Sequence, residues 1–506
     1  MKILFATSEA HPLIKTGGLA DVSGSLPNAL AVLKHKIRLV LPAYRAIMDK
    51  LPPGVMLKKM AEISVQGCGR EFTAKVLQLK AGAVPGIDVP VWLVSIPDLF
   101  DRAGNPYLAA DGSDWWDNGE RFAMFSKVVT ELAMNRLGLK WQPDVVHTND
   151  WQTGLVPALL SLEAQRPKTV FTVHNMAYPG NFPRSLFEQL KLPWALWESE
   201  GVEFWGHFSM LKAGLIKADQ VTTVSPTYAK EICYPEFAYG FEGVLQKRQA
   251  EGRLVGIING IDKTVWNPER DALIAVHYSA QKGRLAGKRA NKKSLLSDLC
   301  RLRGETEKRS NDRMLDCLDK PLIGLVGRLV EQKGIDLVLE ILPELIEQTH
   351  ANFVIVGAGD KVYEVQVKAL AQKYPNRIWA FMGYSESLAH RVEAGADMFL
   401  MPSRFEPCGL NQMYSLVYGT PPIVFHTGGL ADTVVNATEE HIKQGVATGF
   451  VFYDPSRQAL KSTVLHALHL FTKKGIWQTI QKTGMVQNFG WEASAKQYVE
   501  LYLEKR

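Results

Sequence analysis

The strongest constraint on the fold is a six-residue sequence that occurs twice. Thr16-Gly17-Gly18-Leu19-Ala20-Asp21 follows the apolar run Ile3-Leu4-Phe5-Ala6, and Thr427-Gly428-Gly429-Leu430-Ala431-Asp432 follows Pro422-Ile423-Val424-Phe425. Each copy predicts a loop between a strand and a helix. Adjacent glycines let the backbone approach a ligand and point N–H groups at it, and the helix adds its positive end. The repeat therefore predicts two nucleotide-type domains, although glycine pairs also open helices for packing reasons alone.

Apolar runs alternate with helical patterns along most of the chain, which indicates α/β domains with mostly parallel sheets. Phe72–Leu79 and Val89–Ile96 lie too close together for a helix between them, so they predict a hairpin. The 506 residues are too many for one core, and the turn Asn259-Gly260-Ile261-Asp262 marks a hinge. We expect domains at 1–260 and 261–485, and an amphipathic C-terminal helix within 486–506 that packs locally or returns to the first domain.

Composition restricts the class of protein. The net charge of +6 is mild for this length and gives no sign of nucleic-acid binding, and no apolar run approaches a membrane span. The five cysteines are scattered without a CxxC pair, and no cluster has metal-ligand spacing. The short N-terminal apolar run does not match a signal peptide. We expect a cytoplasmic enzyme without a metal; the sequence does not give its oligomeric state.

Two motifs of the second half carry charge after predicted strands. Gly327-Arg328-Leu329 is followed by Gln332-Lys333-Gly334, so Arg328 leaves a strand end and Lys333 begins a helix. Arginine can grip a diphosphate with two hydrogen bonds while lysine supplies a point charge. Ser403-Arg404-Phe405-Glu406-Pro407-Cys408-Gly409-Leu410 places a carboxylate at another strand end. The alternatives are a polar surface loop for Arg328 and Lys333, a helix cap for Glu406, and either a nucleophile or a packed thiol for Cys408.

The first half has polar groups at two adjacent strand ends. His147, Asp150 and Trp151 end one predicted strand, and His174 and Asn175 end the next. Such groups suit a sugar, with Trp151 offering an apolar face to the ring. His147 is as well explained as a structural histidine.

Taken together, these motifs resemble those of the bacterial glycogen synthases that use ADP-glucose. The resemblance covers nearly the whole chain and includes Lys15 with the first glycine loop, Thr172-Val173-His174-Asn175 and the motifs quoted above. It implies the GT-B arrangement, an α/β fold of two Rossmann-like doubly wound domains that face each other across a deep cleft. It also implies transfer of glucose from ADP-glucose to the non-reducing end of an α-1,4-glucan, with retention of configuration and without a cofactor or metal.

The resemblance also implies roles for individual residues. Lys15 contacts the diphosphate or glucose of the donor, Arg328 and Lys333 bind the diphosphate, and His174 and Glu406 meet the transferred glucose. Asp150 and Trp151 lie on the acceptor side, and Tyr384 stacks on adenine. The remaining substrate-binding residues line the donor and sugar sites, with the N–H groups of the second glycine loop on the diphosphate: Gly17, Gly18, Asp21, Asn175, Asn259, Cys408, Gly409, Thr427, Gly428, Gly429 and Leu430.

Two positions depart from the wider pattern. Asn149 stands where many relatives carry histidine, and Tyr414 stands eight residues after Glu406, where the wider retaining group often has a second glutamate. The second departure disfavours a two-carboxylate mechanism. The alternatives are a transferase that uses UDP-glucose, a glucan phosphorylase with pyridoxal phosphate, and a glucan-binding protein without activity.

Overall fold

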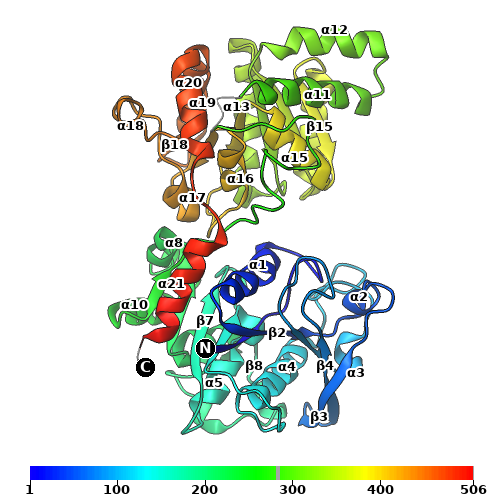
Figure 1. Ribbon diagram of the computed structural model, residues 1–506. Helices are drawn as coiled ribbons and strands as arrows, with labels where there is room; N and C mark the ends of the chain where they lie inside the picture. Colours follow the sequence, from blue (N-terminus) through cyan, green and yellow to red (C-terminus); the bar gives the residue numbers. More distant parts are fainter. Residues whose placement is uncertain (281–284, 505–506) are drawn as a thin grey trace. The chain divides into compact units, whose positions relative to one another are not determined.

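The computed structural model describes residues 1–280 and 285–504. Contacts within the chain divide it into two compact units (Figure 1). Residues 1–260 and the C-terminal segment from Trp491 form the N-terminal unit, and residues 261–490 form the C-terminal unit. Residues 486–490, which the sequence placed with the C-terminal helix, thus group with the C-terminal unit. The predicted domain limits 1–260, 261–485 and 486–506 stay predictions. Residues 505–506 lie outside the described residues.

A nine-stranded sheet is the core of the N-terminal unit, in the order β12-β11-β7-β6-β1-β2-β5-β4-β3. Its strands are β1 (Lys2–Ala6), β2 (Lys36–Pro42), β3 (Lys58–Gln66), β4 (Glu71–Leu79), β5 (Val91–Ser95), β6 (Val145–Asn149), β7 (Lys168–Val173), β11 (Gln220–Thr223) and β12 (Leu254–Gly256). The central strands are continuous apolar runs because helices cover both of their faces. Ile3, Leu4 and Phe5 of β1, for example, are fully buried.

One edge of this sheet is antiparallel. β4 pairs with β5 in antiparallel register, which confirms the predicted hairpin. β3, which pairs with β4, was not predicted, because its residues are mostly polar and exposed, as is usual for an edge strand. A separate three-stranded sheet, also not predicted, joins β8 (Asn181–Pro183), β10 (His207–Ser209) and β9 (Glu203–Phe204).

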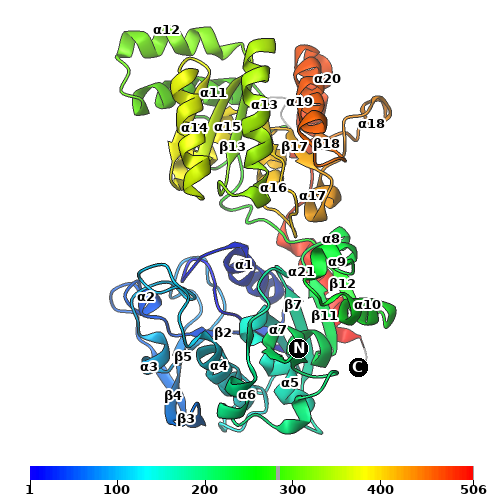
Figure 2. The same cartoon turned by 180° about the vertical axis from the view of Figure 1, so that it is seen from behind.

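Helices cover both faces of the large sheet, as Figures 1 and 2 show from opposite sides, with α1 and α21 on one face and α4, α5 and α7 on the other. The helices of this unit are α1 (Gly18–Val32), α2 (Arg45–Met48), α3 (Pro97–Phe100), α4 (Asn118–Ala133), η1 (Trp151–Thr153), α5 (Leu155–Ser161), α6 (Arg184–Gln189), η2 (Trp194–Leu196), α7 (Met210–Lys217), α8 (Pro226–Glu231), α9 (Pro235–Ala238), α10 (Glu242–Ala250) and α21 (Trp491–Leu503).

The C-terminal unit holds a six-stranded parallel sheet in the order β15-β14-β13-β16-β17-β18. Its strands are β13 (Leu322–Val326), β14 (Asn352–Gly357), β15 (Ile378–Met382), β16 (Met398–Met401), β17 (Pro422–Phe425) and β18 (Phe450–Phe452). Its helices are α11 (Ala286–Leu302), α12 (Glu307–Leu318), η3 (Glu331–Lys333), α13 (Ile335–Gln348), α14 (Lys361–Lys373), α15 (Glu386–Gly395), α16 (Asn411–Val417), α17 (Gly428–Thr433), α18 (Glu439–Gln444), α19 (Arg457–Thr472) and α20 (Lys474–Met485).

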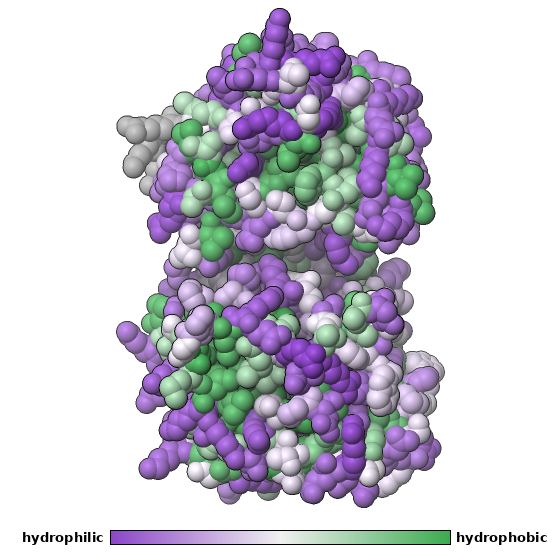
Figure 3. Space-filling view, turned by 90° about the vertical axis from the view of Figure 1, so that its right-hand side faces the viewer, coloured by the Kyte–Doolittle hydropathy of each residue, from purple (hydrophilic) through white to green (hydrophobic). Residues whose placement is uncertain are grey.

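The surface agrees with an ordinary globular composition. On the face shown in Figure 3, hydrophilic residues dominate and hydrophobic residues form smaller patches among them. None of the helices described is both long and apolar enough to cross a membrane.

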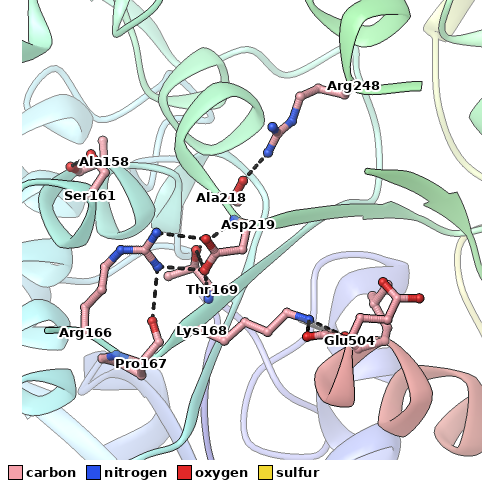
Figure 4. Close-up of polar contacts among 11 residues, drawn as sticks. Ala158, Ser161, Arg166, Pro167, Lys168, Thr169, Ala218, Asp219, Arg248 and Glu504 are labelled. Atoms are coloured by element: carbon pink, nitrogen blue, oxygen red, sulfur yellow. Dashed lines mark hydrogen bonds and ion pairs between the residues drawn. The ribbon is translucent and has the colours of Figure 1, made fainter. Parts of the chain in front are cut away.

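The C-terminal helix α21 packs on α1 and is fixed to the N-terminal sheet at its carboxyl end. The buried Lys168 Nζ donates to the carbonyl oxygens of Leu501 (2.6 Å) and Glu504 (2.7 Å). Figure 4 shows Lys168 and Glu504 together with the Arg166–Asp219 ion pair. A cation at this position also complements the negative end of the helix. Tyr502 OH lies 2.7 Å from Nδ1 of the fully buried His147, whose Nε2 contacts Thr172 Oγ1. His147 is therefore a structural histidine of the N-terminal unit, which was the alternative to a place in the sugar site.

Candidate functional site

In both sheets the candidate residues follow the carboxyl ends of strands, and several of them lie beside the strand at which the order of strands along the sheet reverses. In the N-terminal unit β1 has β2 on one side and β6 on the other. In the C-terminal unit β13 likewise lies between β14 and β16. Open α/β sheets bind ligands in the crevice beyond such a reversal.

A buried carboxylate, Glu9, builds the loop after β1. The backbone N–H of Thr16 donates to Glu9 Oε2, the hydroxyl of Thr16 donates to Oε1 at 2.6 Å, and the N–H of Gly17 donates to Oε2 at 3.3 Å. Tyr107 OH also donates to Oε1, at 2.5 Å. Glu9 and Tyr107 were not predicted as site residues. The sequence feature that could have indicated Glu9 is its position as an acidic residue soon after a buried strand.

The loop presents a cation and an open space. Lys15 Nζ pairs with Asp21 at 2.7 Å, and their side chains are 44% and 23% exposed. A Cβ added at Gly17 or Gly18 would meet no atom within 4 Å among the described residues. Packing therefore does not require these two glycines, and the space in front of the first turn of α1 is open to a ligand.

The buried His174 and the half-buried Asp150 form one polar arrangement at the ends of β7 and β6. His174 Nε2 donates to Asn149 Oδ1 at 3.0 Å, a tautomer that leaves Nδ1 as the acceptor nitrogen. Burial lowers the pKa of His174 to about 3, so the imidazole is neutral at pH 7. Many relatives carry histidine at position 149. In this chain the amide oxygen of Asn149 orients the ring of His174.

Asp150 is held in an unusual state. Its Oδ1 accepts from the backbone N–H of His174 at 2.7 Å, and burial raises its pKa to about 7. Its φ of 55° and ψ of 178° lie in a region that non-glycine residues rarely adopt, at a cost of about 1–3 kcal/mol. Strain and a shifted pKa at a strand end are both typical of functional residues.

Two neighbouring residues correct or extend the sequence analysis. Trp151 is 8% exposed, and Phe122 and Phe182 pack against its ring at centroid distances of 5.1 and 5.6 Å. The prediction that this ring offers an open face to a sugar is therefore wrong. Asn259, which follows β12, is buried, and its Oδ1 has no hydrogen-bond partner among the described residues, so an acceptor is available to a ligand.

The C-terminal unit brings Lys333 and Glu406 together. Lys333 Nζ forms an ion pair with Glu406 Oε2, which also accepts from Ser403 Oγ at 3.0 Å. Glu406 is thus not the cap of α16, whose N-cap residue is Leu410. Arg328 is exposed beside this pair, with Nη2 3.3 Å from Gln332 Oε1. The sequence analysis did not anticipate Ser403.

The second glycine loop differs from the first. A Cβ at Gly428 or Gly429 would lie closer than 3.0 Å to the backbone of Glu406 or Cys408, so packing alone requires both glycines. The N–H of Gly429 donates to Glu406 O (3.1 Å), and the N–H of Leu430 donates to Thr427 O (3.0 Å). Both N–H groups therefore have backbone acceptors in this structure, and their role toward the diphosphate stays a prediction.

The other predicted residues of this unit take distinct positions. Tyr384 follows β15 and is 77% exposed, so its ring can stack on a base. Cys408 is a buried thiol, and Gly409 has a φ of 71° that suits glycine. Tyr414 is buried and stacks on Trp266 at 3.8 Å, so its side chain serves packing.

Sequence comparison finds models of two known families in the chain. The family described as "Starch synthase catalytic domain" matches residues 2–247, and "Glycosyl transferases group 1" matches residues 310–474. Among curated relatives, the chain is 66% identical to a glycogen synthase of Hydrogenovibrio crunogenus, over 99% of both chains. It is 47% identical to one of Thioalkalivibrio sulfidiphilus, again over 99% of both chains.

Solved structures are similar over the same length. The catalytic domain of starch synthase IV from Arabidopsis thaliana, bound to ADP and acarbose, matches with a TM-score of 0.84 and 28% identity, covering 99% of this chain and 98% of that one. A sucrose-phosphate synthase from Thermosynechococcus elongatus matches in fold, with a TM-score of 0.56, 18% identity and the same coverage.

Proposed function

Because this chain belongs to the glycogen synthase family, we propose that it transfers glucose from ADP-glucose to the non-reducing end of an α-1,4-glucan, with retention of configuration. It is a glycosyltransferase of the GT-B fold class with two Rossmann-like units. The starch synthase neighbour is bound to ADP and acarbose, which supports an adenine nucleotide donor and a glucan acceptor.

The observation that carries the proposal is the grouping of Arg328, Lys333 and Glu406 beyond β13 and β16. Two cations at this edge suit the diphosphate of the donor. Glu406 holds Lys333 in place and offers a carboxylate to the sugar or to charge that develops on its anomeric carbon. The exposed ring of Tyr384 provides a surface for adenine.

The N-terminal unit supplies the groups for the sugar and the acceptor. Lys15 is a surface cation that can leave Asp21 for the donor diphosphate, because exposed ion pairs contribute little stability. His174 is a neutral imidazole with an acceptor nitrogen, which suits a sugar hydroxyl. Asp150 and the buried acceptor Asn259 Oδ1 provide further polar contacts.

In the proposed reaction the bond between the anomeric carbon and the phosphate oxygen breaks while the acceptor 4-hydroxyl attacks from the same face. The hydroxyl proton passes to the departing phosphate oxygen, and ADP leaves. The main catalytic task is to stabilise the negative charge on that diphosphate, which Arg328 and Lys333 do without a metal or cofactor. This route is favoured over a double displacement because Tyr414 stands where the wider retaining group often has a second glutamate.

We also propose that the enzyme works in the cytoplasm. All five cysteines are free thiols, which suits a reducing compartment.

The test is incubation of the purified protein with radiolabelled ADP-glucose and glycogen. We expect label in the polymer, and we expect β-amylase to release it as maltose because the new linkage is α-1,4. Absence of incorporation would refute the proposal. Incorporation from glucose 1-phosphate instead would indicate a phosphorylase.

A further inference from the structure

The N-terminal unit contains a cavity of about 630 Å³ that includes none of the candidate site residues. It lies along α7 and α10, which contact each other, and α10 also contacts β12 (Figure 2). This volume is within the range of pockets that bind small molecules. Three glutamates line the cavity against five basic residues: Lys212, Lys217, Lys247, Arg248 and Arg253. The lining therefore carries an excess of positive charge.

One of the three glutamates, Glu200, lies among the lysines. Lys247 Nζ donates to its Oε2 at 2.6 Å, and both side chains are exposed. This hydrogen bond is the main cause that lowers the pKa of the Glu200 carboxyl, and the charges of Lys212 and Lys217 lower it further. A carboxylate of the chain itself thus occupies a position that suits a bound anion. Because exposed ion pairs contribute little stability, a ligand can replace it.

The other two glutamates are held by other groups. Glu203 Oε1 accepts from the backbone N–H of Gly206 at 2.7 Å, and Glu251 forms an ion pair with Arg248 at 3.1 Å. Lys212 Nζ donates to the carbonyl oxygen of Glu203, which is one acceptor for its three N–H donors among the described residues. The lysines around Glu200 therefore have donors to offer to further oxygen atoms.

Arg248 adds an unused donor to the cavity. Its side chain is 6% exposed, and its Nε has no hydrogen-bond partner among the described residues. Its Nη2 donates to the carbonyl oxygen of Ala218, as Figure 4 shows. Burial lowers the pKa of Arg248 most, and repulsion from Arg253 lowers it further, while Glu251 raises it. An anion in the cavity would satisfy the Nε donor and offset the repulsion between the two guanidinium groups.

An exposed tryptophan lines the cavity at the tip of a tight turn. Phe204 pairs with His207, so Trp205 and Gly206 form the two-residue connection between β9 and β10. Both have positive φ values, 50° and 79°, and this turn normally has asparagine or aspartate before the glycine. The tryptophan is nevertheless 82% exposed, so packing within the unit does not explain its presence. Lys212 Nζ lies 5.8 Å from the centre of the Phe204 ring, which places this turn beside the lysines.

We propose that this cavity binds a small phosphomonoester, whose phosphate replaces the Glu200 carboxylate among the lysines and whose ring stacks on Trp205. A phosphomonoester carries about −1.5 to −2 charges at pH 7, against a single charge on Glu200, so the exchange strengthens the attraction to the lysines. Lysine and arginine together also bind several phosphate oxygens at once. A sugar phosphate and a nucleoside monophosphate share this chemistry. The site includes no residue of the proposed transfer reaction and does not rest on the proposed function.

Isothermal titration calorimetry measures the binding of three probes: inorganic phosphate, ribose 5-phosphate and adenosine 5′-monophosphate. Lys247→Met removes one cation, and Glu200→Gln removes the competing charge. Trp205→Asn removes the ring and places a residue that the turn favours. The first two variants should keep the melting temperature of the wild type, because their ion pair is exposed.

Two control variants test the location of binding. Lys230→Met changes an exposed lysine of α8, which lies in the same unit and does not line the cavity. Arg328→Ala removes a cation of the proposed donor site. Neither change should affect the affinity for the esters.

We expect at least one ester to bind the wild type more tightly than inorganic phosphate does. Lys247→Met should raise the Kd of that ester roughly tenfold, as for the loss of one charge-assisted hydrogen bond, and Glu200→Gln should lower it several-fold. Trp205→Asn should reduce the affinity to near that of inorganic phosphate. Tighter binding of adenosine 5′-monophosphate than of ribose 5-phosphate would identify a nucleoside monophosphate as the ligand, and equal or weaker binding would identify a sugar phosphate.

The contrary outcomes are equally specific. No binding of either ester, or binding that Lys247→Met leaves unchanged, would overturn the inference. Weaker binding in Glu200→Gln would also overturn it, because the carboxylate would then be part of the site and not the group that the phosphate replaces. Loss of binding in Arg328→Ala would place the esters in the donor site instead. None of these results depends on glucose transfer, so failure of the proposed function would be seen separately.

Discussion

The ion pair between Lys333 and Glu406 makes a prediction that separates stability from catalysis. In Lys333→Met, Glu406 keeps only its hydrogen bond from Ser403 among the contacts that the structure gives its carboxylate. Breaking a buried ion pair typically costs 3–5 kcal/mol. The Lys333 side chain is 24% exposed and the bond from Ser403 remains, so we expect a loss of about 2 kcal/mol in the free energy of unfolding.

The catalytic effect should be separate and larger. If Lys333 stabilises the charge on the departing diphosphate, its removal raises the barrier by about 3 kcal/mol, which lowers kcat roughly a hundredfold. Arg328→Ala should lower kcat by a similar factor without loss of stability, because Arg328 is exposed and its side chain makes one long hydrogen bond, to Gln332, among the described residues.

The assay combines urea unfolding with initial rates at saturating donor. The double variant Lys333→Met/Glu406→Gln removes both charges and should recover most of the lost stability, since glutamine still accepts from Ser403. Its kcat should stay low. A kcat of Lys333→Met within a few-fold of the wild type, with only KM raised, would refute the leaving-group role. A double variant no more stable than Lys333→Met would refute the account of the ion pair.

Lys15→Ala should impair donor use while changing the free energy of unfolding by less than about 1 kcal/mol, because its ion pair with Asp21 is exposed. Gly18→Ala should be tolerated in folding, whereas Gly429→Ala should lose about 2 kcal/mol or more in urea unfolding, since its Cβ meets the backbone of Cys408. Burial lowers the pKa of His147 to about 3, so the unfolded chain binds a proton below pH 6.5 that the folded chain does not. Between pH 6.5 and 5 the wild type should therefore lose about 2 kcal/mol relative to His147→Gln.

Each of these has a contrary outcome. A large fall in melting temperature for Lys15→Ala would make that residue structural. Equal stability of the two glycine variants would contradict the different packing of the two loops. A difference between His147→Gln and the wild type that does not change with pH would mean that the folded protein protonates His147.

The sequence predicted the central strands well, because strands buried on both faces are long apolar runs such as Ile3–Ala6 and Leu322–Val326. It failed for β3, an edge strand in which only alternate residues of its second half, Ala61, Ile63 and Val65, turn an apolar side chain inward while the residues between them are polar and exposed. The short strands β8, β9 and β10 were missed for a related reason: two or three residues are too few for any periodicity.

The candidate site was predicted at the level of loops but not of contacts. The six identical residues at 16–21 and 427–432 need their glycines for different reasons, and only the neighbouring backbone of Glu406 and Cys408 distinguishes the copies. Glu9 and Tyr107 are likewise far apart in sequence and meet only in the folded unit. The sequence also does not show which side chains other residues cover. For this reason Trp151, whose ring is buried, was expected to face a sugar.

The most direct test of the proposed function is the comparison of two donors with glycogen as acceptor. The exposed ring of Tyr384, at the end of β15 in the sheet whose strand β13 leads into the Arg328 and Lys333 loop, predicts selection of the adenine nucleotide. We expect kcat/KM for ADP-glucose to exceed that for UDP-glucose by roughly tenfold or more, a difference of about 1.4 kcal/mol in transition-state binding. Equal values of kcat/KM, or a preference for UDP-glucose, would contradict the account.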